Sequence, residues 1–365
     1  MNGPRRLLLG GLIGILIVVM AQALIGILVL PRFAVDIEIP LRAGMRWVAG
    51  QPPYLSDAFK EPPGPTLPFL YPPITLPFLA AIDQLPRSPV EIGGVVGLFA
   101  CAVLACRRLA VPWLWTPLFL AWPPFAEGIV SGNVQIALFA AFVYLFFEPG
   151  GDPWSPTPRD LADRSTSGVM IGGLATLPGA VKVPQPHAWL YALRHRPLAA
   201  VGGAIVAGIV AAATGILTGF ALWSDWLAQL RLANDPAWDV GGIALSRYLP
   251  EGIGFAIVVI CLVAVLFVPW RSAGAWVGVL SVVGSVSLHT FGLLFLLPAM
   301  LIIRREIALI VAILIATYTL QGTWIAIAVC AWTFAASFRW RGLREPTIGK
   351  ESDAPVGGTL VVRPT

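Results

Sequence analysis

Long apolar stretches separated by short polar or proline-rich intervals recur along almost the whole chain. The first runs from Leu7 to Leu30, and its 24 residues would rise about 36 Å as a helix, enough to cross the core of a bilayer. Basic residues precede it, and the apolar run continues beyond a signal-peptidase-like Ala21-Gln22-Ala23. We therefore interpret it as an uncleaved first helix with a cytoplasmic N-terminus.

Later apolar stretches are often too short to span a membrane. They lie at 71–85, 88–106, 112–127, 133–147, 167–181, 184–193, 198–223, 252–269, 273–288, 290–303, 307–320 and 322–338. Several have only 10 to 16 residues, whereas a spanning helix needs about 20. We expect an all-α polytopic membrane protein with about 10–13 transmembrane or re-entrant helices. Residues 1–338 would form one membrane unit, followed by a disordered cytoplasmic tail at 339–365.

Two longer polar intervals, at 31–70 and 224–251, are the expected outer loops. The first follows a helix that starts in the cytoplasm. Within it, Leu41, Met45 and Val48 share one helical face, which predicts a short amphipathic helix on the membrane surface.

Arginines at the ends of apolar runs set the expected orientation under the positive-inside rule. The pairs Arg194/Arg196 and Arg304/Arg305 are placed inside, which puts the break after Lys182 outside. With Arg107/Arg108 also inside, 71–85 and 88–106 cannot both cross, so we expect 71–85 to be partly re-entrant.

Composition narrows the class of protein. Of the 365 residues, 57% are hydrophobic and 12% charged, about half the charge of a soluble domain. This excludes a disordered chain, a nucleic-acid-binding arm and an ordinary water-soluble enzyme. The net charge of +5 comes from arginines that orient helices, so we expect membrane lipids and no nucleic acid as partners.

Three ionisable features converge on the expected outer face: Asp36 with Glu38, Lys182, and His289. Ionisable groups at membrane depth are costly and often mark function. The alternatives are a helix-end charge in water, a lysine that reaches the interface, and a buried histidine with satisfied hydrogen bonds. The spacing of Asp36 and Glu38 could also hold a divalent cation, so metal dependence stays open.

A carboxylate, a histidine and cations on one face suit transfer of a group from a phosphate leaving group. The carboxylate would take a proton from an attacking hydroxyl, and the cations would stabilise the departing phosphate. The chain contains no P-loop, G-x-S-x-G or H-E-x-x-H motif, which argues against ATP-driven pumping, lipase chemistry and metalloprotease chemistry.

A series of short elements resembles a known family. They are Asp36, Gly50-Gln51-Pro52-Pro53-Tyr54, Phe69-Leu70-Tyr71-Pro72-Pro73, Glu127-x4-Gly132-Asn133-x-Gln135, Ser167-Gly168-Val169-x-x-Gly172 before Lys182-x-Pro184, Ser246-Arg247, and Ser287-Leu288-His289. Each is weak alone, but their order resembles the bacterial polyprenyl-phosphate-mannose-dependent mannosyltransferases, glycosyltransferase family 87 of the GT-C class. The resemblance covers roughly 7–305.

The resemblance implies a GT-C-like, inverting glycosyltransferase in the cell membrane. It would move a sugar, most simply mannose, from a polyprenyl-phosphate donor to a lipid or glycan acceptor on the outer side. Asp36 and His289 would be catalytic. The substrate-binding residues would be Lys182, which we assign to the phosphate, and Arg42, Arg46, Glu38, Tyr71, Asn133, Gln135 and Arg247.

Departures from the family pattern affect the identity of the substrates. The usual tyrosine after the aspartate is missing, and Gly132-Asn133 stands where Gly-Gln is usual. Arabinose, glucose or an aminosugar therefore remains an alternative to mannose. The rival functions are a transporter or flippase of a lipid-linked or anionic substrate, and a non-catalytic scaffold.

Overall fold

The computed structural model of the chain describes residues 33–55, 68–151, 153–182, 186–233, 242, 244–286 and 288–302, with isolated positions near both ends. Within them, helices are joined by loops and two isolated β-bridges, and no strand occurs, as the all-α prediction requires. Apart from isolated positions, the predicted first helix, the stretches 307–320 and 322–338, and the tail 339–365 lie outside the described residues.

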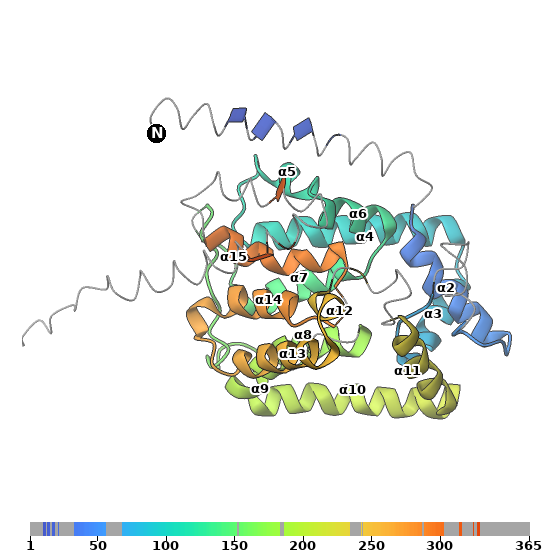
Figure 1. Cartoon of the computed structure of the whole chain (residues 1–365). Helices are drawn as coiled ribbons and strands as arrows, with labels where there is room; N and C mark the ends of the chain where they lie inside the picture. The colour runs from blue at the N-terminus through green and yellow to red at the C-terminus, as the bar shows by residue number, and fades with distance from the viewer. Residues whose placement is uncertain are drawn as a thin grey trace, which may run out of the picture.

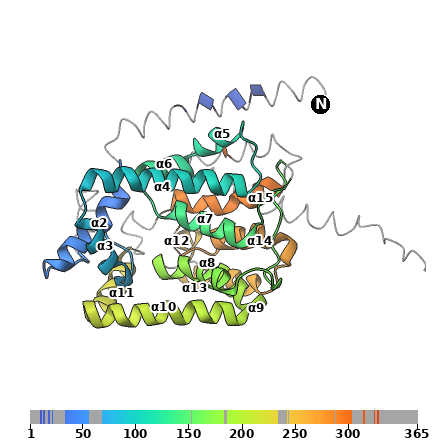
Figure 2. The same cartoon turned by 180° about the vertical axis from the view of Figure 1, so that it is seen from behind.

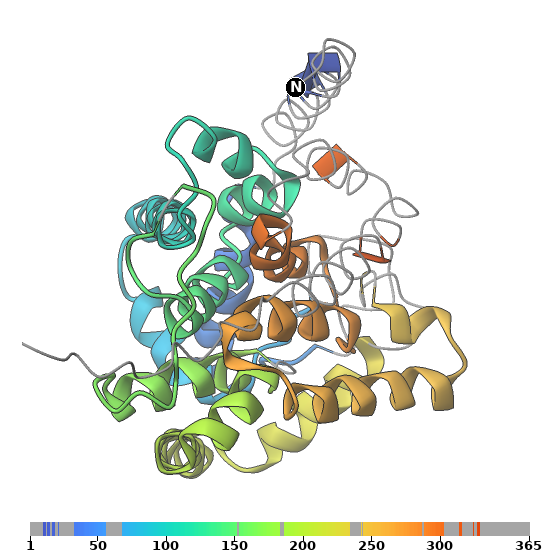
Figure 3. The ribbon, with the colours of Figure 1, turned by 90° about the vertical axis from the view of Figure 1, so that its left-hand side faces the viewer.

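Two long helices, α4 (Arg87–Arg108) and α10 (Pro197–Thr218), run along opposite sides of the bundle (Figure 1). Figure 3 shows both nearly end-on, so their axes point along a common direction. Each has 22 residues and is long and apolar enough to cross a membrane. Large apolar side chains such as Val96 on α4 and Ile209 on α10 are more than half exposed. Such exposed apolar faces are suited to lipid, and they indicate a membrane protein.

Shorter apolar helices make up much of the rest of the bundle. They are α7 (Gln135–Phe146), α13 (Glu251–Val265), α14 (Ala273–Val283), η4 (Thr290–Leu296) and α15 (Leu297–Ile302). Their core is aromatic: the ring centroid of Phe295 lies 5.6 Å from that of Phe139 and 5.0 Å from that of Phe142. At Gly278 a Cβ would lie 2.1 Å from the Phe295 carbonyl oxygen, so α14 and η4 meet backbone to backbone.

Helices α8 (Gly168–Val181) and α9 (His187–His195) form a helical hairpin. The Arg196 guanidinium, just after α9, donates to the carbonyls of Asp163 and Thr166, just before α8. The hairpin therefore starts and ends at one end of the bundle. With 14 residues, α8 rises only about 21 Å. Both helices are short, as the apolar stretches 167–181 and 184–193 predict, and Lys182 follows α8 directly at the tip of the hairpin.

Helices α8 and α10 run parallel and touch through small residues. A Cβ on Gly172 would lie 2.3 Å from the Ala199 carbonyl oxygen, and one on Gly203 would lie 2.4 Å from the Gly172 carbonyl oxygen. Small residues four apart let helices in membranes approach this closely. The hairpin is thereby fixed against a long helix.

The parts of the two expected outer loops that the structure describes pack against each other at one end of the bundle. They contain α2 (Val35–Val48), most of α11 (Ala221–Ala233) and α12 (Leu245–Tyr248). Figures 1 and 2 show α2, α3 (Leu76–Asp83) and α11 gathered at this end. The Trp226 indole donates to the Leu70 carbonyl at 3.0 Å, and the Gln229 amide donates to the Leu55 carbonyl at 3.1 Å.

Two predictions from the sequence concern this end of the bundle: the amphipathic helix within 31–70 and the stretch 71–85. In α2, Leu41 is buried while Met45 and Val48 are more than half exposed, so only part of the predicted apolar face is free to lie on a membrane. The stretch 71–85 forms η2 (Pro73–Thr75) and the eight-residue α3, which packs beside α2. Eight residues rise about 12 Å, so α3 alone is too short to cross a bilayer. The partly re-entrant placement of 71–85 stays a prediction.

Candidate functional site

Asp36 lies in the first turn of α2, beside the end of α6 (Pro123–Ser131). The Ala34 amide donates to the Val130 carbonyl at 2.8 Å, which docks the start of α2 on α6. Ala34 adopts a left-handed conformation with φ 55°, unusual for a residue with a side chain. This turn directs Asp36 toward the loop between α6 and α7.

Two side chains from that loop hold the Asp36 carboxylate by a single oxygen. The Ser131 hydroxyl donates to Oδ2 at 2.7 Å, and the Asn133 amide donates to the same oxygen at 3.0 Å. The other end of the Asn133 side chain, Oδ1, accepts a hydrogen bond of 2.9 Å from the backbone amide of Gln135. This second bond fixes which way the Asn133 amide faces. Within the described residues, Oδ1 of Asp36 accepts no further side-chain hydrogen bond, so it is available to a ligand.

Gly132, between these two side chains, has φ +79° and ends α6. A Cβ there would lie 2.5 Å from Ile37 Cγ1, next to Asp36 in α2. Glycine is thus required twice, for the left-handed backbone and for the approach of Ile37. The Gly132-Asn133 element therefore shapes the cradle of Asp36.

Lys182 lies close enough to Asp36 for the two charges to interact. Burial lowers the pKa of Lys182 to about 8, and the Asp36 carboxylate acts in the opposite direction. Since α8 and α7 pack antiparallel, the hairpin tip that carries Lys182 lies near the start of α7 and the Asn133 loop. A cation and a carboxylate that are 146 positions apart in sequence are brought to one site.

Tyr71 also faces this site. Burial, and secondarily the Asp36 charge, raises the pKa of its phenol, so the hydroxyl stays protonated and can donate. Its backbone carbonyl accepts a 2.9 Å hydrogen bond from the Tyr54 hydroxyl. Tyr71 is therefore anchored through the first loop.

His289 lies at the same end of the bundle. Phe291, two residues later, packs against Gly128 in α6 beside Ile136. Leu288 pairs with Gly242 in a parallel bridge, and a Cβ on Gly242 would lie 2.9 Å from His289 Nδ1. Gly242, with φ +69°, thus lets the second loop approach the histidine. His289 thus precedes a segment that packs on α6, the helix whose end holds Asp36.

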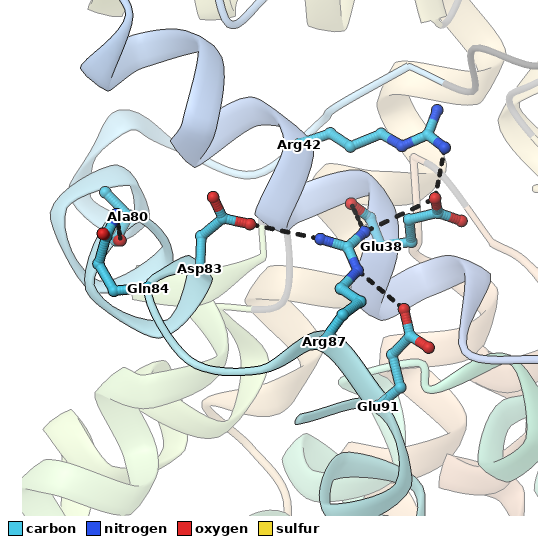
Figure 4. A network of polar contacts seen from close by, with 7 residues as sticks. All are labelled: Glu38, Arg42, Ala80, Asp83, Gln84, Arg87 and Glu91. Atoms are coloured by element: carbon cyan, nitrogen blue, oxygen red, sulfur yellow. Dashed lines mark hydrogen bonds and ion pairs between the residues drawn. The ribbon is translucent and has the colours of Figure 1, made fainter. Parts of the chain in front are cut away.

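Glu38 and its arginines form a separate network, which Figure 4 shows. Glu38 pairs with Arg42 one turn later, and Arg87 reaches the Glu38 carboxylate at 3.6 Å. Arg87 also contacts Asp83 at 3.3 Å and Glu91 at 2.8 Å. Two helical positions are about 200° apart, so Glu38 and Asp36 point to different sides of α2. The network ties α2, α3 and α4 together.

The remaining predicted site residues are Gln135, Arg46 and Arg247. Gln135 is buried, 2% exposed, in the first turn of α7. Arg46 lines a small cavity of about 50 Å³ with Arg42 and Phe69. The side chain of Arg247, in α12, lies outside the described residues.

A metal site is not assembled from the described side chains. Asp36 and Glu38 engage different partners, and no group of three or more His, Cys, Asp or Glu residues gathers within the described ranges.

Sequence reasoning missed Ser131 and Arg87. Ser131 is an ordinary serine in sequence, and only the docking of α2 on α6 places it beside Asp36. Arg87 could have been suspected, since carboxylates four residues away on both sides are typical of helical ion pairs. Its link to Glu38, 49 positions away, has no signal in the sequence.

Comparison with known families gives one match, and neither a curated protein nor a solved structure matches the chain. The model of glycosyltransferase family 87 matches residues 69–288, more than half of the chain. This range includes Tyr71, Asn133 and Lys182, while Asp36 precedes it and His289 follows it directly. The chain therefore belongs to glycosyltransferase family 87, and it is a glycosyltransferase.

Proposed function

We propose that this glycosyltransferase moves a mannosyl group from a polyprenyl-phosphate donor to an acceptor hydroxyl on the outer side of the membrane. One observation carries the proposal: a carboxylate held by one oxygen lies within electrostatic reach of a half-buried lysine. The first supplies a proton acceptor, and the second a cation for the departing phosphate.

In the proposed step, Asp36 Oδ1 takes the proton of the acceptor hydroxyl. The hydroxyl oxygen attacks the anomeric carbon and forms the new glycosidic bond. The bond from that carbon to the phosphate oxygen breaks, and the polyprenyl phosphate leaves with the electron pair. Attack and departure on opposite faces invert the anomeric centre.

Asp36 is a better candidate for the base than Glu38. The Glu38 carboxylate is paired with Arg42 and Arg87, so it is engaged in the network that joins α2, α3 and α4. Asp36 accepts hydrogen bonds from two neutral groups on the same oxygen. That arrangement fixes the carboxylate plane and leaves the other oxygen for the acceptor.

The other predicted residues take supporting roles in the proposal. Lys182 holds the donor phosphate, and the Tyr71 hydroxyl donates to it. His289 orients the donor or acceptor by hydrogen bonding or shares in proton handling. Asn133 positions Asp36, and Gln135 supports Asn133 through its backbone amide. Arg42, Arg46 and Arg247 attract the anionic substrate at the mouth of the site.

The test is incubation of membranes containing the protein with radiolabelled polyprenyl-phosphate mannose, glucose or arabinose, followed by identification of the product. We expect a new mannosyl glycosidic bond with inverted configuration. Transfer from the glucose or arabinose donor alone would show that the transferred sugar is not mannose. Movement of the labelled lipid across vesicle membranes without a new bond would favour a flippase. Function that survives combined loss of Asp36, Lys182 and His289 would favour a scaffold.

A further inference from the structure

A long apolar furrow lies between α8 and α10 and extends to η2 and α3. Its volume is about 1270 Å³, above the range of about 300–1,000 Å³ that is common for small-molecule pockets. One wall carries Val169, Gly173 and Leu177 of α8, and the other carries Leu198, Gly202 and Val206 of α10.

The furrow has the shape of an alkyl chain site. Its lining residues recur every three or four positions on two parallel helices, so the furrow follows the helix axes. Gly173 and Gly202 have open space where a Cβ would stand, which widens the furrow in the middle. A bound hydrocarbon chain would remove these apolar walls from water, which is favourable.

The end of the furrow away from Asp36 is basic. Arg164 and Arg196 both line it there, next to the starts of α8 and α10. Arg196 is held in place by the Asp163 and Thr166 carbonyls, with Nη2 3.5 Å from an ideal Cβ of Gly168. The Asp163 carboxylate accepts hydrogen bonds from the Ser165 backbone amide at 2.9 Å and the Ser165 hydroxyl at 2.7 Å, and it also lies close enough to Arg196 for the two charges to interact.

Apolar exposure begins directly beside these cations. Val169 and Leu198, at the mouth of the furrow, are 88% and 90% exposed. An apolar furrow with two guanidinium groups at one end is complementary to a molecule with hydrocarbon chains and an anionic head group. Arginine and phosphate form strong, charge-assisted hydrogen bonds.

We propose that the furrow binds an anionic phospholipid. Its phosphate would lie between Arg164 and Arg196, and its acyl chains would follow α8 and α10 toward Thr75 and Phe78. The site is separate from Asp36 and does not depend on the proposed sugar transfer. The phosphate position between Arg164 and Arg196 lies at the opposite end of the hairpin from Lys182, whereas the other end of the furrow reaches Val181, next to Lys182.

The test uses the full-length protein in mild detergent, offered phosphatidylglycerol and phosphatidylcholine with identical acyl chains. Native mass spectrometry counts the lipids retained on the protein. We expect phosphatidylglycerol to be retained in preference. Arg164→Gln should lower phosphatidylglycerol retention about fivefold, the contribution of one basic residue at an anionic surface, and leave phosphatidylcholine unchanged.

Two matched pairs of variants separate the furrow from general effects. Gly202 lines the furrow and has open space where a Cβ would stand, so Gly202→Leu should fill the furrow and lower phosphatidylglycerol retention. Gly208 lies on the same helix with equally open space but outside the furrow, so Gly208→Leu should not lower it. Arg231→Gln on α11 is an exposed control for the loss of charge. If Gly202→Leu misfolds by its melting temperature, Gly173→Leu takes its place.

Equal retention of the two phospholipids by the wild-type protein would overturn the proposal. So would unchanged phosphatidylglycerol retention in Arg164→Gln. If Gly202→Leu releases bound polyprenyl phosphate and leaves phosphatidylglycerol unaffected, the furrow belongs to the donor chain and the proposal is wrong.

Discussion

The Ser131 hydroxyl donates a hydrogen bond of 2.7 Å to Asp36 Oδ2 across 95 positions of sequence. Asn133 donates to the same oxygen, so Oδ2 is saturated, while Oδ1 accepts no side-chain hydrogen bond from the residues that the structure describes. A carboxylate oriented in this way can present Oδ1 to an acceptor hydroxyl without first reorganising. We regard Ser131 as a positioning residue, since it acts through Asp36.

Ser131→Ala should lower kcat by about 10- to 100-fold, because a hydrogen bond to a charged group contributes about 1.5–3 kcal/mol. The pH profile of kcat should also shift, which a purely structural defect would not cause. The measurement is sugar transfer by the purified protein across a pH range. Ser281→Ala is the control, because Ser281 is an equally buried serine that donates only to the Val277 carbonyl. Equal losses in both variants would contradict a positioning role.

Gly132→Ala should destabilise the protein more than Gly50→Ala does. Both glycines have positive φ, so both substitutions carry a backbone cost of about 1–2 kcal/mol. Only at Gly132 does the new Cβ also meet Ile37, whereas Gly50 has open space. Thermal unfolding in detergent measures the difference, and we expect transfer activity to fall only in Gly132→Ala. Indistinguishable variants would show that the Ile37 contact does not matter.

Donor use should weaken as the pH rises through 8. With its pKa lowered to about 8 by burial, Lys182 is cationic below that pH and neutral above it. The attraction to the donor phosphate is therefore present below pH 8 and lost above it. The value of kcat/KM for the donor reports the free enzyme, so it should show an alkaline limb near pH 8.

Lys182→Arg should remove this limb, because a guanidinium stays charged throughout the range. An alkaline limb that persists in Lys182→Arg would assign the titration to another group. Lys182→Met should give a low, flat profile with a raised KM for the donor.

Arg87→Gln should loosen the joint between α2, α3 and α4. Arg87 contacts three carboxylates on these helices, and exposed ion pairs contribute about 0.2–1 kcal/mol each. We expect a loss of about 1 kcal/mol in the free energy of unfolding and a lower kcat. For stability, Arg42→Gln is the matched control, since among the described residues Arg42 forms an ion pair within α2 alone, which should contribute about 0.3–0.5 kcal/mol. Urea titration measures the free energy of unfolding of both variants, and sugar-transfer assays measure kcat of Arg87→Gln. A larger loss of stability in Arg42→Gln than in Arg87→Gln would contradict the role of Arg87 in joining α2, α3 and α4.

Several features of the fold follow from the apolar pattern alone. The stretches 88–106, 133–147 and 167–181 correspond to α4, α7 and α8, because a continuous apolar run bounded by polar residues specifies a helix in lipid. The short length of the 167–181 and 184–193 stretches also indicated half-helices. The pattern did not reveal that Gly172 and Gly203 meet, since contact between helices depends on rotation about their axes.

The candidate site was predictable only in part. Asp36 and Lys182 stand out because charges are rare in this chain, and the structure brings them within electrostatic reach. Glu38 is just as rare, yet its position on α2 turns it toward Arg87. Ser131 gave no signal because a serine is unremarkable until its neighbour across the fold is known.

The central claim is that Asp36 is the base that activates the acceptor. Its most direct test is the rate of mannosyl transfer from labelled polyprenyl-phosphate mannose by purified Asp36→Asn, with Glu38→Gln as the control. We predict that Asp36→Asn lowers kcat by about 10²–10⁴-fold, with an unchanged melting temperature, while Glu38→Gln keeps most of its activity. Near wild-type transfer by Asp36→Asn would contradict the account.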